Sequence, residues 1–171
     1  MEGKIKNPNG LAREFHEMGI PFMFDPGQGL PMYNGDELLN FMQQANYIAV
    51  NDYEAQLLQD RTGYKLESLA NKDKVLIITL GANGSVIYAE GKKIEIPCVE
   101  PREIVDPTDC GDAYRAGLLY GIVKSLDWQT TGQLGSLLGS LKIAHRGGQN
   151  HQFTREEIDQ AYFENFGARI F

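Results

Sequence analysis

The sequence predicts an α/β fold, in which a layered, mainly parallel sheet is flanked by helices. Two observations favour this class. Short apolar runs alternate with helical patterns through about the first 80 residues. The run Val75–Ile78 is apolar at every position, which is typical of a strand buried on both faces in the middle of a parallel sheet. We expect right-handed crossovers between the strands and ligands beyond their carboxyl ends.

The first half is expected to begin with a helix at 11–18, which has amphipathic spacing between the turn Asn7–Gly10 and Gly19. The compact apolar run Ile20–Phe24 ends at the turn Asp25–Gly27, so it predicts a buried strand. The other elements of this half follow the same two patterns, with helices expected at 36–45, 52–61 and 66–71 and strands at 47–50 and 74–80.

The second half is expected to start with a hairpin and to continue in helices. The runs 85–89 and 92–97 flank Glu90-Gly91, a pair suited to a tight turn. From Asp112 onward the apolar spacing is helical and predicts helices at about 111–125, 130–145 and 154–165. No internal repeat or linker interrupts the sequence, so we expect one domain over residues 1–171.

Composition narrows the class of partner. The 171 residues are 42% hydrophobic and 23% charged, as in an ordinary globular domain. The 16 Lys and Arg against 23 Asp and Glu give a net charge of -7, which disfavours nucleic acid as a partner. No apolar run approaches the roughly 20 residues of a membrane span, and Met1–Lys4 is not followed by a signal core. These features predict a cytoplasmic chain.

Cysteines and histidines give weak signals. Cys98 and Cys110 could form a disulfide, but two cysteines in a domain of this size are more typical of reduced thiols. The three histidines, His16, His145 and His151, lack compact metal-ligand spacing. We expect His145 and His151 to border a nucleotide or cation pocket.

The segment Asp106–Gly117 carries the strongest functional signal. Its turn of small residues leads into a helix, so backbone N–H groups and the positive end of the helix dipole converge and suit a phosphate. Asp112 lies in the first helical turn, where it is suited to act as a general base on an attacking hydroxyl. The alternative is a carboxylate that only interacts with the helix dipole.

This segment resembles the Asp-Thr-x-Gly-x-Gly-Asp hallmark of the ribokinase-like, or PfkB-type, sugar and nucleoside kinases. The resemblance implies that Asp112 is the catalytic base and that Cys110, Gly111 and Asp112 supply the backbone amides of an anion hole. It also implies that Asp106 and Thr108 belong to a monovalent-cation site, which would take K⁺.

Asp109 is expected to lie at the nucleotide site and departs from the family, which ordinarily has glycine at this position. One interpretation is an N-cap, a common role of Asp before a helix. The other is a second carboxylate that opposes the transferring phosphate, by roughly 1 kcal/mol in water-like surroundings and about 4 kcal/mol at an effective dielectric of 20. Cys110 also has two interpretations: a nucleophile activated by the helix N-terminus, or a small residue that fills the turn.

Two further segments resemble family motifs, each directly after a predicted strand. Asn51–Glu54 matches Asn-x-x-Glu, which implies that Asn51 lies at the nucleotide site and that Glu54 helps to hold Mg²⁺. Thr79–Gly84 matches Thr-x-Gly-x-x-Gly, which implies that Thr79, Gly81 and Gly84 line the ATP site. The alternatives are ordinary polar residues at a helix start and an ordinary glycine turn.

The resemblance covers essentially the whole chain, but it begins partway along the sequence of a complete family member. The Gly-Gly substrate motif and the small β-sheet lid of complete members have no match here, so we expect a partial domain, truncated at its N-terminus. Phe24–Gln28 and His145–His151 look more like bacterial adenosine kinases or related sugar kinases than ribokinase itself.

The leading hypothesis is ATP-dependent phosphoryl transfer, with Mg²⁺ and K⁺, to a hydroxyl of a sugar or nucleoside. The alternative is a non-catalytic nucleotide-binding fragment or a degenerated kinase copy. Because loss of the N-terminal strands would expose a sheet edge, we also expect a homo-oligomer.

Overall fold

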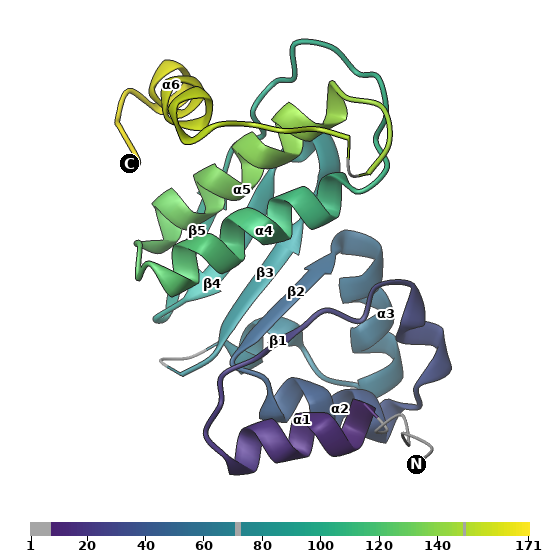
Figure 1. The fold of residues 1–171 in the computed structure, drawn as a ribbon. Helices are drawn as coiled ribbons and strands as arrows, with labels where there is room; N and C mark the ends of the chain where they lie inside the picture. The colour runs from purple at the N-terminus through teal and green to yellow at the C-terminus, as the bar shows by residue number, and fades with distance from the viewer. Residues whose placement is uncertain (1–7, 71–72, 149) are drawn as a thin grey trace, which may run out of the picture. The chain divides into compact units, whose positions relative to one another are not determined.

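A computed structural model describes residues 8–70, 73–148 and 150–171, and its chain divides into two compact units. The first unit comprises Met1–Leu80 and Val86–Lys93, and the second comprises Gly81–Ser85 and Ile94–Phe171. Figure 1 shows the elements of both units along the chain.

The five strands form one sheet in the order β1-β2-β3-β4-β5. They span Met23–Phe24, Tyr47–Asn51, Val75–Thr79, Ser85–Ala89 and Lys92–Ile96. The first three are parallel: Phe24 is paired with Ile48, and Asn51 with Thr79. This arrangement confirms the predicted α/β class with a mainly parallel sheet.

Helices α1 (Pro8–Glu17), α2 (Gly35–Gln44) and α3 (Asp52–Thr62) accompany the parallel strands of the first unit. Helices α1 and α2 pack against each other (Figure 1). Each element contributes apolar side chains at its own period to one shared core, which includes Ala12, Phe24, Leu38, Phe41, Met42, Ile48, Val50, Leu58 and Leu76.

The hairpin of β4 and β5 turns at Glu90 and Gly91, whose φ angles are 54° and 73°. Two successive residues at positive φ are characteristic of the type I′ turn, whose twist matches that of the two strands. The predicted hairpin is therefore confirmed, including the turn residues.

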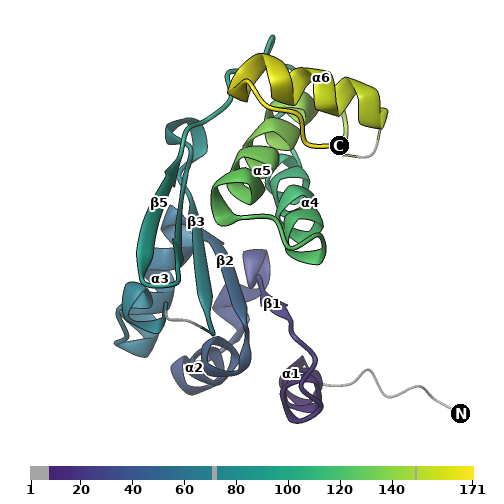
Figure 2. The ribbon, with the colours of Figure 1, turned by 90° about the vertical axis from the view of Figure 1, so that its left-hand side faces the viewer.

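Helices α4 (Cys110–Val123), α5 (Trp128–Ile143) and α6 (Arg155–Phe166) belong to the second unit, and α6 packs against α5 (Figure 2). Helices α4 and α5 are antiparallel and cross so closely that a Cβ added at Gly117 would lie 2.6 Å from the Cα of Gly135. Leu134, Leu137, Val99 and Tyr162 form a second core.

The strand predicted at 20–24 is much shorter than expected, because only Met23 and Phe24 pair with β2. Pro21 has no N–H to donate, and the N–H of Ile20 is donated to Phe15 O at the end of α1. The Phe22 N–H is donated to the side chain of Asn46. Over Ile20–Phe22 the backbone N–H groups are therefore donated outside a sheet ladder or are missing.

Other boundaries differ by a few residues. Helix α1 begins at Pro8 rather than at 11, since the fixed φ of proline suits the first helical position. The helix expected at 66–71 is a 3₁₀ helix over Leu66–Leu69, and Asn71 lies outside the described residues. Among the helices described, none is both long and apolar enough to cross a membrane.

Candidate active site

The start of α3 is closed by its own side chains. The Asn51 Oδ1 accepts the Glu54 N–H at 2.7 Å, and the Glu54 Oε2 accepts the Asn51 N–H at 2.9 Å. This reciprocal pair is a capping box, which satisfies two of the donors that a helix leaves open at its N-terminus. Glu54 is only 9% exposed. Its second oxygen, Oε1, makes no hydrogen bond with other residues of the described chain.

Thr79 lies directly beside Asn51 at the carboxyl end of the next strand, because the two residues are register partners in β2 and β3. The Thr79 hydroxyl is 3.5 Å from Val50 O, a long contact that leaves it available to other partners. Asn51 and the first residue of the Thr79–Gly84 motif are thus adjacent in the first unit, as the parallel sheet requires.

Gly81 and Gly84 border a single 3₁₀ turn after β3, with φ angles of 58° and 84°. The turn requires glycine most strictly at Gly84, where an added Cβ would overlap Ile96 O and lie 2.9 Å from Cys98 N. Beside it, the buried Ser85 hydroxyl hydrogen bonds with the Tyr114 hydroxyl at 2.6 Å. This bond joins the glycine turn to α4 within the second unit.

Asp106 organises the turn that precedes α4. Its Oδ1 accepts the Thr108 N–H at 3.0 Å, and its Oδ2 accepts the Gly147 N–H at 2.8 Å. The Gly147 N–H, followed by the bonds from Thr108, holds the pKa of Asp106 well below its usual value. The carboxylate therefore ties together two loops that are distant in sequence.

Lys142 lies behind this turn and was not predicted as a site residue. Its side chain is fully buried, and its Nζ donates a hydrogen bond to Asp106 O at 3.0 Å. The sequence contained a signal, since Lys142 follows Gly135 and Gly139 at helical spacing, on a face of α5 with little side-chain volume. A long side chain on such a face has room to lie along the helix and reach the preceding loop.

Asp109 does not cap α4 with its side chain, so that interpretation is wrong. It occupies the N-cap position in the left-handed conformation, with φ 59° and ψ 15°, and its side chain makes no capping bond. The carboxylate instead lies against Gly148, where an added Cβ would overlap it. Glycine adopts this conformation freely, which explains why it ordinarily occupies the position.

The first turn of α4 is open. Cys110 donates its N–H to Pro107 O at 3.3 Å, so this amide closes the turn and is not directed outward as the anion-hole hypothesis required. The N–H groups of Gly111 and Asp112 make no hydrogen bond within the described chain. The Asp112 side chain is exposed and stands on the same turn as these two donors.

The surroundings of Cys110 disfavour an activated nucleophile. Burial raises the pKa of its thiol, Lys142 opposes that rise, and the carboxylates of Asp106 and Asp109 reinforce it. A neutral thiol fits the second interpretation, a small residue that fills the turn. Both Cys98 and Cys110 are free thiols, so the disulfide alternative is also wrong.

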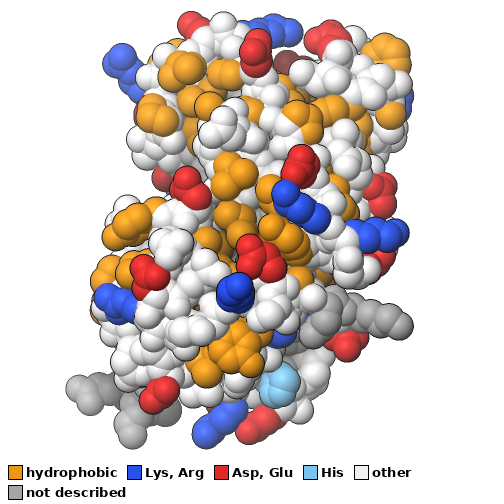
Figure 3. All heavy atoms as spheres, turned by 180° about the vertical axis from the view of Figure 1, so that it is seen from behind, with side chains coloured by type: hydrophobic (Ala, Val, Ile, Leu, Met, Phe, Trp, Pro, Cys, Tyr) orange, Lys and Arg blue, Asp and Glu red, His pale blue; other side chains and the backbone are white. Residues whose placement is uncertain are grey.

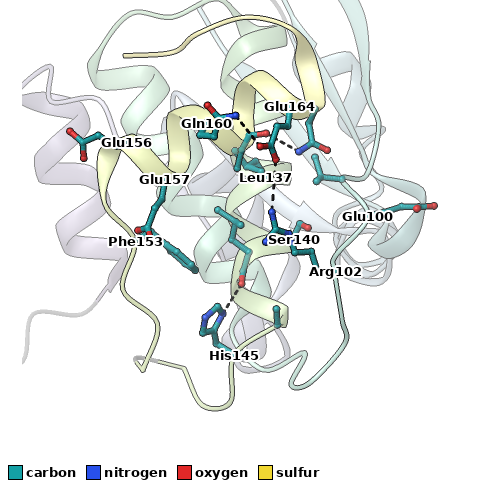
Figure 4. Close-up of a pocket in the computed structure, with 15 residues that line it drawn as sticks. Glu100, Arg102, Leu137, Ser140, His145, Phe153, Glu156, Glu157, Gln160 and Glu164 are labelled. Carbon is teal, nitrogen blue, oxygen red and sulfur yellow. Dashed lines mark hydrogen bonds and ion pairs between the residues drawn. The ribbon is translucent and has the colours of Figure 1, made fainter.

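A pocket of about 510 Å³ opens in the second unit between α5, α6 and the segment after β5 (Figure 4). Apolar side chains such as Leu137 and Phe153 line it together with Arg102, Glu164 and other charged residues. His145 borders it and bonds to Leu141 O through Nδ1 at 2.9 Å. None of the motif residues lines this pocket, so sequence motifs and cavity do not coincide here.

The structure groups the predicted residues into two sets. Asn51, Glu54 and Thr79 belong to the first unit, whereas Gly81, Gly84 and the segment 106–112 belong to the second. The meeting of all three motifs at one nucleotide stays a prediction. No group of three or more His, Cys, Asp or Glu side chains suited to a metal occurs in residues 8–70, 73–148 and 150–171.

A family model described as pfkB family carbohydrate kinase matches residues 12–155. The chain belongs to this family. Similar pfkB-family proteins include the nucleoside kinase of Methanocaldococcus jannaschii, which is 36% identical over 135 residues, 79% of this chain and 45% of the relative. The ribokinase of Bacillus subtilis is 27% identical over 150 residues, 88% of this chain and 49% of the relative.

Among solved structures, the nucleoside kinase of Burkholderia thailandensis in complex with inosine superposes with a TM-score of 0.91 at 47% identity, covering 95% of this pfkB-family chain and 54% of that one. The same enzyme is also known in complex with ADP-inosine. This likeness confirms the ribokinase-like fold. The chain spans about half the length of the relatives it matches.

Proposed function

We propose that this chain supplies the nucleotide-binding and catalytic part of an ATP-dependent kinase that phosphorylates a hydroxyl group of a nucleoside. The observation that carries the proposal is the 47% identity and TM-score of 0.91 to a nucleoside kinase solved with inosine. The relative with ADP-inosine supports an adenine nucleotide as the second ligand. A cytoplasmic location belongs to the same proposal.

In this proposal Asp112 is the general base. Its carboxylate takes the proton of the acceptor hydroxyl, whose oxygen then bonds to the γ-phosphorus of ATP while the bond to the β,γ-bridging oxygen breaks and ADP leaves. The open N–H groups of Gly111 and Asp112, at the positive end of α4, stabilise the charge on the transferring group. Cys110 contributes volume to the turn rather than a donor, because its N–H is already bonded to Pro107 O.

Thr79, Gly81 and Gly84 would line the ATP site, and Asn51 would hold the start of α3. Glu54 fits Mg²⁺, because its buried carboxylate retains one oxygen, Oε1, without a hydrogen bond, and carboxylate oxygens are ligands that Mg²⁺ prefers. When bound, Mg²⁺ neutralises charge that develops on the phosphates.

The proposed K⁺ site at Asp106 and Thr108 fits less well. The Asp106 carboxylate accepts N–H bonds at both oxygens, and the buried ammonium of Lys142 already lies against Asp106 O. A second cation beside that ammonium would experience like-charge repulsion in a poorly hydrated place.

Self-association is a further part of the proposal. Strand β1 ends the sheet order, so in the described chain one of its edges has no neighbouring strand. Hydrophobic side chains are exposed among charged ones on the face shown in Figure 3. On α4, Leu119 and Val123 are 51% and 78% exposed. Light scattering of the purified chain should show a dimer, whereas a monomer at all concentrations would contradict this.

The function is tested in two steps. Calorimetry on the 171-residue chain should detect ADP binding, even if weak. Turnover is then measured on a chimera in which this chain replaces the matching part of the B. thailandensis kinase, with ATP, Mg²⁺ and a panel of inosine, adenosine, guanosine and ribose. Phosphorylation of nucleosides is expected. ADP binding without turnover in the chimera would favour a non-catalytic nucleotide-binding fragment, and absence of both would refute the proposal.

A further inference from the structure

Lys142 is the largest fully buried side chain that carries a formal charge in the described residues. Lysine is almost never fully buried unless its charge is paired or bonded, so its position requires an explanation. The Nζ donates to Asp106 O, the carbonyl at the start of the turn that leads into α4. The side chain thus reaches from the C-terminal turn of α5 to the loop that precedes the open helix N-terminus.

The charge of Lys142 acts on both ends of this turn. The pKa of the Asp106 carboxyl is lowered mainly by the Gly147 N–H and the bonds from Thr108, and the charge of Lys142 adds to that lowering. The same charge opposes the burial that raises the pKa of the Cys110 thiol. Three residues separate these two groups along the chain, and Gly111 and Asp112, the proposed phosphate donors, follow immediately. A single buried cation is therefore placed behind the part of the fold that would receive a phosphate.

The surroundings of the ammonium resemble those that a bound monovalent cation needs. A K⁺ ion in a protein is held by oxygen atoms, above all backbone carbonyls. Lys142 Nζ lies at 3.0 Å from such a carbonyl, with the carboxylate of the same residue near enough to be affected by its charge. An ammonium carries the same unit charge as K⁺, but it is attached to the chain and cannot dissociate.

We propose that the ε-ammonium of Lys142 takes the electrostatic place of a bound monovalent cation behind the turn 106–112, so that this chain needs no K⁺ to bind a nucleotide. The proposal rests on the proposed function for its nucleotide, but not for the position of the charge. Lys142 is a positioning residue in this scheme: it holds the Asp106 carbonyl and makes the turn attractive to anions without touching the substrate.

The first test uses the unmodified chain. Thermal unfolding and ADP binding are measured in KCl and in tetramethylammonium chloride at equal ionic strength. Since a ligand that binds the folded state raises the unfolding temperature, a K⁺ site would produce a saturable rise with KCl. We expect no such rise, and an ADP Kd that differs by less than about twofold between the two salts. A saturable response to K⁺ would overturn the proposal.

The second test removes the charge. Lys142→Met keeps an unbranched apolar stem of similar length, and Lys124→Met at the exposed end of α4 is the matched control. We expect Lys142→Met to weaken ADP binding by about tenfold or more, as for other couplings between neighbouring sites, and KCl to restore part of the loss by filling the vacated place. Lys124→Met should behave as the unmodified chain in both salts.

The outcomes separate the two proposals. The proposal that Lys142 takes the place of a bound cation would be rejected by either of two results: an unchanged ADP affinity in Lys142→Met, or a weakened affinity that KCl does not restore. If Lys142→Met does not fold, the salt comparison on the unmodified chain decides alone. If no variant binds ADP, the proposed function fails, and the unfolding temperatures in KCl still test the role of Lys142.

Discussion

Helices α3 and α4 both begin at a family motif, yet they differ in whether side chains accept the backbone N–H groups of the first turn. At α3, Asn51 and Glu54 close a capping box on each other's N–H groups. At α4, Asp109 sits at the N-cap in the left-handed conformation without a capping bond, and the N–H groups of Gly111 and Asp112 stay open. A helix that caps itself gains stability, whereas one that leaves its donors open keeps them for an anion.

This contrast shows that a sequence motif can reflect either a local structural role or a ligand-binding role. The same two residues, Asn51 and Glu54, that resemble a nucleotide and metal motif also form a capping box, and Asn34 and Glu37 form one at the same Asn-x-x-Glu spacing at the start of α2. A local structural role therefore accounts for much of the Asn-x-x-Glu pattern. At α4 no side chain caps the N–H groups of Gly111 and Asp112, which agrees with the ligand proposed for them.

The largest expected effect comes from the open turn. In the chimera with the B. thailandensis kinase, Asp112→Asn should lower kcat by about 10²–10⁴-fold, the usual contribution of a general base, and leave ADP affinity nearly unchanged. Steady-state kinetics and calorimetry measure the two quantities. Asp36→Asn, in the first turn of α2, is the control for loss of a carboxylate at a helix start. A near-normal kcat in Asp112→Asn would remove Asp112 from the mechanism.

Substitution in the capped first turn of α3 should change the stability of the chain rather than its turnover. Asn51→Ala removes the acceptor of the Glu54 N–H and should cost about 1 kcal/mol, or about 2–4 °C in Tm for a chain of this size. Asn34→Ala removes the equivalent cap from α2 and should cost a similar amount. Thermal unfolding followed by circular dichroism compares them. If Asn51→Ala abolished ADP binding at unchanged Tm, the distinction between a closed and an open turn would collapse.

A smaller effect is expected at Asp109. Asp109→Gly relieves the left-handed strain of a residue with a Cβ, about 1 kcal/mol, but increases the freedom of the unfolded chain by a similar amount, so Tm should rise only slightly. Asp109→Ala keeps the Cβ and loses the carboxylate, so it should lower Tm. Ser125→Gly, at φ 54° after α4, is the control for glycine at another positive φ. Equal Tm values for the Gly and Ala variants would show that backbone strain at Asp109 is negligible.

The last effect depends on pH. The Gly147 N–H lowers the pKa of Asp106, so the ionised carboxylate favours the folded state above its unfolded pKa of about 4 and loses that contribution as pH falls below it. The Tm gap between the unmodified chain and Asp106→Asn should shrink from pH 7 to pH 2. Asp127→Asn, at a carboxylate whose pKa the Thr130 N–H lowers, should behave alike. A gap that is constant with pH would contradict this account of Asp106.

The sequence predicted most of the fold, because periodicity marks elements with a buried face. The apolar run at β3 and the Glu90-Gly91 turn were predicted in place. The strand at Ile20–Phe24 was overestimated, since apolar character does not show whether backbone groups have a strand to pair with. Pro21 was the available signal, as it cannot donate to a ladder.

The candidate site was less predictable. Asp106 and Thr108 were identified through the resemblance, but Lys142 was missed because burial of a lysine depends on a carbonyl from a segment 36 residues away. The conformation of Asp109 was also missed: nothing in its neighbours reveals a positive φ, although the family's glycine was the clue. The roles of Asn51, Glu54, Thr79, Gly81, Gly84, Gly111 and Asp112 as ligand contacts stay predictions.

The close crossing of α4 and α5 has a consequence for how this chain can change over evolutionary time. Gly117 faces the backbone of Gly135, and Gly121 faces the side chain of Thr131, where an added Cβ would lie 2.6 Å from Cγ2. Every other amino acid carries a Cβ, so the first substitution at Gly117 must push the two helices apart. The first turn of α4 would move with its helix, so a substitution at these glycines would disturb the proposed phosphate-binding turn as well as the packing of the two helices.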